Sequence, residues 1–248
     1  MNIKAICFDL GETLIFSGYS LSWSSHYRNA LEKGFLTINR ISSDKDFVDC
    51  IKILTKYNTR ENPRENEITS NIIFDEIMEI LEIGLLEKNI LENAFFKYFQ
   101  QSNQLYDDTH KVLKQIKAYK LKTGILTDVP YGRVKGFVAE DIDVINKNID
   151  IIITSVDVGY RKPNITGYKI LSKKLGTQID EMVYIGNEEK DIIGANNAGM
   201  ISVLINRTGE KIDYGEKYQY KNLLDMWNEL KGIPEFKKQL QQKPDKVF

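Results

Sequence analysis

The chain has 248 residues, of which 42% are hydrophobic and 28% charged, a composition typical of globular proteins and not of disordered or fibrous ones. Its 34 Lys and Arg against 35 Asp and Glu leave a net charge of −1, which argues against nucleic-acid binding. Two cysteines are too few for a disulfide scaffold or a structural zinc site. No signal-peptide pattern opens the chain, and no window approaches the roughly 18 consecutive apolar residues of a membrane span, so we expect a cytoplasmic protein without membrane association.

The first predicted element is a short apolar strand within residues 3–10, and a long helical region follows it. From about residue 20 to residue 105 the sequence has no strand-like run. It carries four apolar stripes at helical spacing instead, within Trp23–Leu31, Phe47–Leu54, Ile73–Leu81 and Leu91–Phe99. Four such helices can bury their stripes against one another, so this region is predicted to be a helical bundle inserted after the first strand.

Beyond residue 105 the sequence alternates amphipathic helices with short apolar runs. These runs are rich in Ile and Val and fall within Thr123–Asp128, Ile149–Ser155, Met182–Gly186 and Ile201–Ile205. Strands that alternate with helices predict an α/β fold with a Rossmann-like parallel sheet. We expect residues 1–18 and 106–232 to form this core, residues 19–105 the helical insert, and residues 233–248 a C-terminal tail.

Polar residues follow several of the predicted strands. Asp9 ends the first strand, Thr127 ends the second, and Asn187 to Asp191 come after the fourth, while the third leads to Lys162. Ligands of parallel α/β sheets bind at the carboxyl ends of the strands, so these side chains are expected to meet. Carboxylates, a hydroxyl and a lysine at one edge suit phosphoryl chemistry, in which a carboxylate attacks phosphorus and cations balance the oxyanion charge.

Four segments, taken in order, resemble the sequence motifs of the haloacid dehalogenase-like hydrolase superfamily. They are Phe8–Leu14, Ile125–Asp128, Arg161–Pro163 and Gly186–Met200. The helical insert lies where this superfamily has its cap domain. The resemblance spans residues 1 to about 207 and implies a Rossmann-like core with a helical cap.

The resemblance also implies a role for each matching residue. Asp9 would be the nucleophile that forms an aspartyl-phosphate, Thr127 would hydrogen-bond the phosphoryl oxygens, and Lys162 would neutralise the charge on both groups. A Mg2+ cofactor would be held by Asp9, the backbone carbonyl of Gly11, Asn187 and Asp191. The implied activity is hydrolysis of a small phosphorylated metabolite; no motif specifies which one, or the oligomeric state.

Two positions depart from the superfamily pattern. Gly11 stands where the family has the aspartate that protonates the leaving oxygen, so the proton has to come from Glu12, a cap residue or water. General acid catalysis contributes roughly 10²–10⁴-fold, so its loss predicts a slower enzyme. Asn187 replaces the first aspartate of the fourth motif, and its neutral oxygen is a weaker Mg2+ ligand than a carboxylate.

These departures leave three alternatives to a Mg2+-dependent phosphatase. Superfamily 2-haloacid dehalogenases use an aspartate nucleophile without Mg2+ and carry an asparagine near the Asn187 position, but they have tyrosine where this chain has Gly11. Phosphonate-cleaving hydrolases have a small residue at the Gly11 position. The third alternative is a catalytically attenuated member that binds a phosphorylated ligand or a protein partner.

Overall fold

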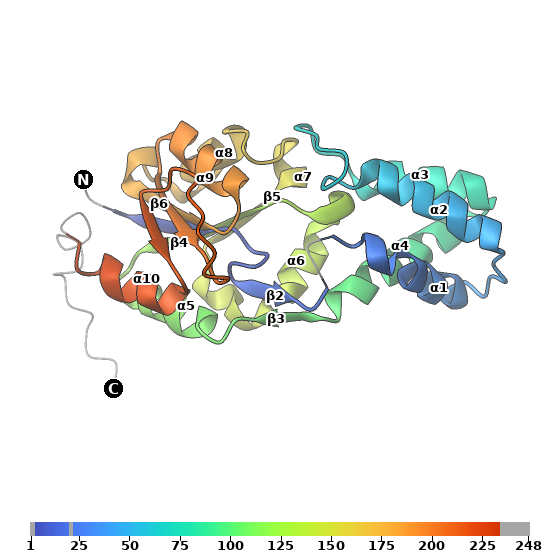
Figure 1. The fold of residues 1–248 in the computed structure, drawn as a ribbon, viewed down its shortest axis with the longest axis horizontal. Coiled ribbons are helices and arrows are strands. Elements are labelled where there is room, and N and C mark those ends of the chain that lie inside the picture. The colour runs from blue at the N-terminus through green and yellow to red at the C-terminus, as the bar shows by residue number, and fades with distance from the viewer. Residues whose placement is uncertain (1–2, 20–21, 234–248) are drawn as a thin grey trace. The chain divides into compact units, whose positions relative to one another are not determined.

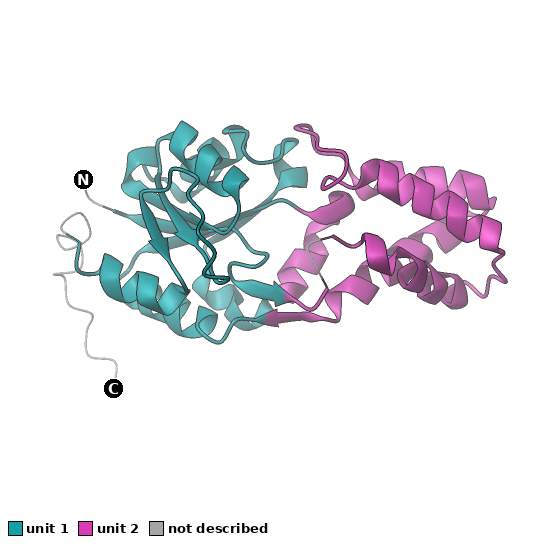
Figure 2. Ribbon diagram, in the orientation of Figure 1, with its two compact units in different colours: residues 1–16, 105–128, 142–248 teal, residues 17–104, 129–141 magenta. Residues whose placement is uncertain are grey.

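The computed structural model describes residues 3–19 and 22–233, and it divides into two compact units (Figure 2). The core unit comprises residues 1–16, 105–128 and 142–248, and the helical unit comprises residues 17–104 and 129–141. None of the helices in the described part of the chain has the length and apolar character that crossing a membrane requires.

A six-stranded parallel sheet forms the centre of the core unit, with strand order β5-β4-β1-β6-β7-β8. Its strands are β1 (Ala5–Phe8), β4 (Lys122–Thr127), β5 (Ile151–Thr154), β6 (Met182–Gly186), β7 (Ile201–Ile205) and β8 (Tyr218–Tyr220). Phe8 of the central strand pairs with Ile125 on one side and with Ile185 on the other. Because of this register, the residues that follow β1, β4 and β6 leave the sheet side by side at its carboxyl edge.

Helices cover both faces of this sheet (Figure 1). They are α5 (Thr109–Ala118), α7 (Ser155–Val158), α8 (Thr166–Leu175), α9 (Glu189–Ala198) and α10 (Leu223–Leu230), with the 3₁₀ turns η3 (Asp143–Asn148) and η4 (Ile179–Glu181). Helices α8 and α9 lie on one face and α5 and α10 on the other. Strands β1, β6 and β7 are buried on both sides, which explains why their sequences are almost continuously apolar and do not alternate.

Four long helices build the helical unit. They are α1 (Tyr27–Thr37), α2 (Asp44–Tyr57), α3 (Ser70–Leu81) and α4 (Leu85–Gln100), accompanied by η1 (Ser24–His26), η2 (Pro130–Gly132) and α6 (Lys135–Asp141). Their apolar stripes enclose a second core rich in phenylalanine, in which Phe74 and Phe96 each pack edge to face against Phe95. A two-stranded sheet of β2 (Ile15–Ser17) and β3 (Asn103–Leu105) joins the chain segments that enter and leave this unit.

The parallel α/β sheet and the inserted helices are therefore confirmed, while two details differ from the sequence prediction. Strands β2, β3 and β8 were not predicted, because each has only three residues and a mixed pattern of burial. Residues 129–141 were expected in the core, but they group with the helical unit because Tyr131 and Phe137 are buried in its apolar core. The expected tail lies, apart from residue 233, outside the described residues.

Candidate active site

The side chain of Lys162 lies at the centre of a buried cluster in the core unit. Its Nζ is 2.5 Å from Asp9 Oδ1 and 2.6 Å from Asp191 Oδ1, and the lysine side chain is only 2% exposed. Asp9 directly follows β1, and Asp191 lies in the first turn of α9. Three residues far apart in the sequence, all predicted site residues, thus converge at the carboxyl edge of the sheet.

The protonation of this cluster follows from its burial and its charges. Burial raises the pKa of the Asp9 carboxyl to about 6, although the neighbouring Lys162 ammonium acts in the opposite direction. Burial alone would lower the pKa of Lys162, but the carboxylates of Asp191 and Asp9 raise it well above its ordinary value. Lys162 is therefore a permanent cation near neutral pH and faces a carboxylate pair that it can only partly neutralise.

Asp191 has a structural task in addition to its contact with Lys162. Its Oδ2 accepts hydrogen bonds from the backbone N–H groups of Asn187 and Glu188, at 3.1 Å and 3.0 Å, and so caps the start of α9. The residue before this turn has to be glycine, because a Cβ at Gly186 would lie 2.4 Å from the Asp191 Cβ. Both Asp191 oxygens are thus engaged by protein donors, which favours a role in holding Lys162.

Two residues without a predicted role complete the surroundings of Lys162. The hydroxyl of Tyr184 on β6 lies 3.2 Å from Lys162 Nζ and donates to the Leu126 carbonyl at 2.7 Å. Asp128 Oδ1 accepts the Lys162 backbone N–H at 3.1 Å, and its Oδ2 lies 3.2 Å from Lys190 Nζ. A polar hydroxyl inside an otherwise apolar strand was the only sequence signal for Tyr184, and Asp128 was noted only as a strand-end residue.

The side of the cluster that carries Asp9 Oδ2 and Thr127 is available to a ligand. Within the described part of the chain, Asp9 Oδ2 accepts no hydrogen bond and Thr127 makes none through its side chain, although Asp9 is only 6% exposed and Thr127 5%. Gly11 is exposed, and a Cβ built there would meet no atom within 4 Å. A carboxylate oxygen beside the lysine and a hydroxyl at the end of β4 thus have no hydrogen-bond partner in the described chain, and the Gly11 position is uncrowded.

The groups that could bind a metal ion here are oxygen donors, of which only one, the Asp9 carboxylate, is charged. Over residues 3–19 and 22–233, no group of three or more His, Cys, Asp and Glu side chains is arranged to hold a metal ion. The resemblance assigns Asp9, Gly11, Asn187 and Asp191 to the metal, and the oxygens of Asp191 are already engaged by protein donors. This leaves Asp9 Oδ2, the Gly11 carbonyl and Asn187 Oδ1, and the last of these accepts a hydrogen bond from Thr13 at 3.1 Å. Such a set fits Mg2+, which takes hard oxygen ligands, often only one or two carboxylates, together with water and phosphate oxygens.

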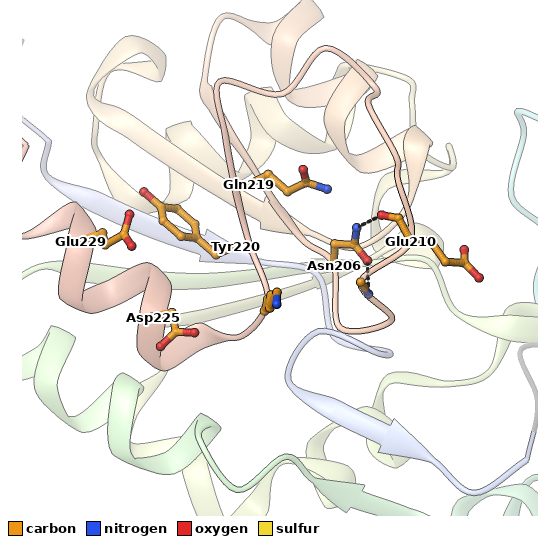
Figure 3. A pocket seen from close by; sticks show the side chains of 8 residues that line it. Asn206, Glu210, Gln219, Tyr220, Asp225 and Glu229 are labelled. Atoms are coloured by element: carbon orange, nitrogen blue, oxygen red, sulfur yellow. Dashed lines mark hydrogen bonds between the residues drawn. The ribbon is translucent and has the colours of Figure 1, made fainter.

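A separate cavity of about 380 Å³ lies beyond the carboxyl ends of β7 and β8 (Figure 3). It is lined by Asn206, Gly209, Glu210, Gln219, Tyr220, Lys221, Asp225 and Glu229. The amide of Asn206 donates to the Glu210 carbonyl at 2.7 Å and accepts from Gly209 N–H at 3.1 Å. Asn206 thus holds a turn, and the cavity includes none of the predicted site residues.

The sequence profile of the haloacid dehalogenase-like hydrolases matches residues 3–199, which contain all of the clustered residues. The chain belongs to this family. Its members are hydrolases. The structure brings the predicted site residues Asp9, Lys162 and Asp191 together, and their assignment as the active site, like the role of each residue, stays a prediction.

Curated relatives of this family member carry phosphatase names. The glyceraldehyde 3-phosphate phosphatase of Methanocaldococcus jannaschii is 27% identical over 212 residues, which cover 82% of this chain and 85% of the relative. A phosphoglycolate phosphatase of Yersinia pestis is 29% identical over a shorter match, 45% of this chain and 47% of the relative.

Solved structures of both phosphatases and dehalogenases share the fold. A HAD phosphatase from Thermococcus onnurineus has a TM-score of 0.63 at 19% identity and covers 93% of this chain and 99% of its own. A 2-haloacid dehalogenase from Pseudomonas syringae pv. Tomato has a TM-score of 0.66 at 18% identity, with coverage of 92% and 98%. At these identities the similarity establishes the fold, and the reaction has to be argued from the site.

Proposed function

We propose that this chain is a Mg2+-dependent phosphatase that hydrolyses a small phosphorylated metabolite through an aspartyl-phosphate on Asp9. The observation that carries the proposal is the position of Lys162 Nζ between Asp9 and Asp191, 2.5 Å and 2.6 Å from their oxygens, beside an Asp9 oxygen that has no hydrogen-bond partner in the described chain. The phosphatase names of the relatives support the same reaction class.

In this mechanism Asp9 Oδ2 attacks the phosphorus, and the bond between phosphorus and the leaving oxygen breaks. Lys162 holds Asp9 Oδ1 and balances the charge of the phosphoryl group, and the Thr127 hydroxyl donates to a phosphoryl oxygen. Water then attacks the phosphorus of the aspartyl-phosphate, which releases inorganic phosphate and restores the Asp9 carboxylate. The net reaction consumes one water and yields an alcohol and phosphate.

The leaving oxygen takes its proton from water in this proposal. Gly11 has no proton to donate, and the carboxylate of the next residue, Glu12, accepts a hydrogen bond from the Tyr106 hydroxyl at 2.7 Å. Substrates with acidic leaving groups are therefore expected to be the faster ones.

Asp9, the Gly11 carbonyl and Asn187 are the residues we assign to Mg2+, with Asp191 contributing through its hold on Lys162. Phosphatases of this family generally use a divalent metal ion. When bound, the ion supplies positive charge for the phosphoryl oxygens. Asn187 provides no negative charge, so we expect Mg2+ to bind weakly until a phosphoryl group adds its own oxygens, and each ligand then strengthens the binding of the other.

A metabolite screen tests the proposal. Purified protein and its Asp9→Asn variant are incubated with phosphate esters, including glyceraldehyde 3-phosphate and phosphoglycolate, with and without Mg2+, and released phosphate is measured. We expect Mg2+-dependent phosphate release that the variant lacks. Parallel reactions with 2-chloropropionate are assayed for chloride: metal-independent chloride release without phosphate release would identify a dehalogenase. Release of neither product, with phosphate binding retained, would identify a ligand-binding protein.

A further inference from the structure

Thr13 makes contacts that the proposed reaction does not yet use. It is completely buried on the loop after β1, and its hydroxyl donates to Asn187 Oδ1 at 3.1 Å, a partner 174 residues away in the sequence. Its backbone carbonyl accepts a hydrogen bond from Arg207 at 3.0 Å. Thr13 therefore connects the loop of the nucleophile to the asparagine that replaces the family carboxylate.

Arg207 is itself held firmly in place. Its guanidinium nitrogens lie 3.1 Å and 3.3 Å from the two carboxylate oxygens of Asp108, and its Cζ lies 3.6 Å above the ring of Tyr106. Asp108 also accepts the backbone N–H of Leu223 at 2.7 Å, which ties it to the start of α10. A bidentate, ring-stacked arginine of this kind has little freedom to move, so the Thr13 carbonyl has a fixed partner.

The substitution of an asparagine for a carboxylate makes such an anchor necessary. A carboxylate has two equivalent oxygens and can offer one to a cation in either orientation. An asparagine has one oxygen and one NH2 group, and the NH2 end repels a cation. A hydroxyl that donates to Oδ1 selects the orientation in which the amide oxygen, and not the NH2 group, faces Thr13 on the loop that carries Asp9 and Gly11.

We propose that Thr13 is a positioning residue that orients the Asn187 oxygen for a divalent cation, and that Arg207 holds Thr13 in the position required. The inference rests on the proposed function, because it concerns the same Mg2+ site. Partners of metal ligands commonly change metal affinity by about 10–100-fold when they are removed. Thr13 acts through Asn187 and does not itself contact the reacting atoms.

Calorimetric titration of Mg2+ in the presence of inorganic phosphate tests this role without measuring turnover. Thr13→Val keeps the shape of the side chain but removes the hydroxyl, and we expect it to weaken Mg2+ binding by about 10-fold. Thr13→Ser keeps the hydroxyl and is the matched control, with an expected affinity close to that of the wild type. Circular dichroism and the urea midpoint verify that each variant folds.

The decisive comparison repeats Thr13→Val in the Asn187→Asp background. The two oxygens of a carboxylate are equivalent and need no selection, so in this background the same substitution should change Mg2+ affinity by less than about 3-fold. The difference between the two backgrounds measures the coupling between Thr13 and Asn187. If Thr13→Val does not fold, Arg207→Lys replaces it: lysine cannot form the bidentate contact with Asp108, and its effect should show the same dependence on background.

The possible results distinguish failure of the Thr13 inference from failure of the proposed function. Equal weakening in both backgrounds would reveal a general structural role, and unchanged affinity in Thr13→Val would show that the hydroxyl does not orient the amide; either overturns the inference and leaves the phosphatase proposal intact. Absence of Mg2+ binding in both wild type and Asn187→Asp, even with phosphate, would overturn the metal-dependent function and this inference with it.

Discussion

The site consists of two halves with opposite properties. Around Lys162, the carboxylates of Asp9 and Asp191 and the hydroxyl of Tyr184 are buried and joined by short contacts. In the other half, Gly11 is exposed and Asn187 half-buried, and a Cβ at Gly11 would meet no atom within 4 Å. The half to which we assign the phosphoryl charge thus keeps the family pattern, whereas the half that would supply a proton and a metal carboxylate departs from it. Nucleophilic attack therefore depends on one half, and leaving-group protonation and metal affinity depend on the other, so mutations in the two halves should have different effects on the kinetics.

The largest effect is expected from the nucleophile in the first half. Asp9→Asn keeps the volume of the side chain but removes the attacking carboxylate, so kcat should fall by about 10⁴-fold or more. Phosphate release from the best substrate measures it, and the urea midpoint shows whether the fold is kept. Asp44→Asn, at an exposed position of the helical unit, is the matched control and should leave kcat unchanged. Wild-type turnover by Asp9→Asn would rule out the aspartyl-phosphate mechanism.

The next effect concerns the missing proton donor of the second half. Gly11→Asp restores a carboxyl group at a position where a Cβ meets no other atom, so the substitution should be tolerated. We expect kcat for an alkyl phosphate to rise by up to about 10²–10⁴-fold, whereas an aryl phosphate, whose leaving group needs little protonation, should gain much less. Paired assays with both esters measure the contrast. An equal gain for the two esters would mean that another group already protonates the leaving oxygen.

A smaller effect separates the two roles open to Asp191. If it mainly holds Lys162, as its hydrogen bonds indicate, Asp191→Asn should lower kcat by about 10²-fold through a misplaced lysine and change the half-saturating Mg2+ concentration little. Asn187→Asp should do the reverse, lowering the Mg2+ requirement with a modest change in kcat at saturation. Mg2+ titrations of activity for both variants give the two values. A large rise in the Mg2+ requirement of Asp191→Asn would instead assign it directly to the metal.

Whether a residue of this site could be predicted depends on whether the local sequence or a distant contact places it there. Asp9, Thr127 and Lys162 were identifiable because they lie at or after strand ends and within family motifs, which local sequence displays. Tyr184 was not, because a tyrosine in a continuously apolar strand has the pattern of a core residue, and only the pairing of β6 with β1 brings its hydroxyl to Lys162.

Residues 129–141, which were expected in the core unit, were misassigned for the same reason: distant contacts place them in the helical unit. Pro130 and Gly132 indicate a turn after Thr127, but they do not indicate where the chain goes next. The direction is decided by contacts with distant residues: Tyr131 hydrogen-bonds the hydroxyl of Tyr27, and a Cβ at Gly132, whose φ is +62°, would lie 2.2 Å from the Ile68 carbonyl oxygen. Such tertiary contacts have no counterpart in the local sequence pattern.

The smallest expected effect tests whether the buried half also stabilises the fold. Burial alone would raise the pKa of the Asp128 carboxyl, but the cations Lys162, Lys190 and Arg161 hold it below its ordinary value. A carboxyl whose pKa is lowered by folding stabilises the protein above its unfolded pKa, near 3.9, and loses that contribution as the pH falls through the folded value. Asp128→Asn should therefore lower the free energy of unfolding by about 1–3 kcal/mol at pH 7 and by progressively less below about pH 4.

Fluorescence-monitored urea unfolding can measure this in the core unit alone. The chain has 2 tryptophans, and in a Trp23→Phe background Trp227, buried on α10, reports on the core. Asp44→Asn again serves as the control, because its ion pair with Arg28 is exposed to solvent and such pairs contribute little. If Asp128→Asn lost as much stability at pH 3.5 as at pH 7, the carboxylate charge would not be the cause. The effect would then come from the hydrogen bond that the Lys162 backbone N–H donates to Oδ1, which the asparagine oxygen would fail to reproduce.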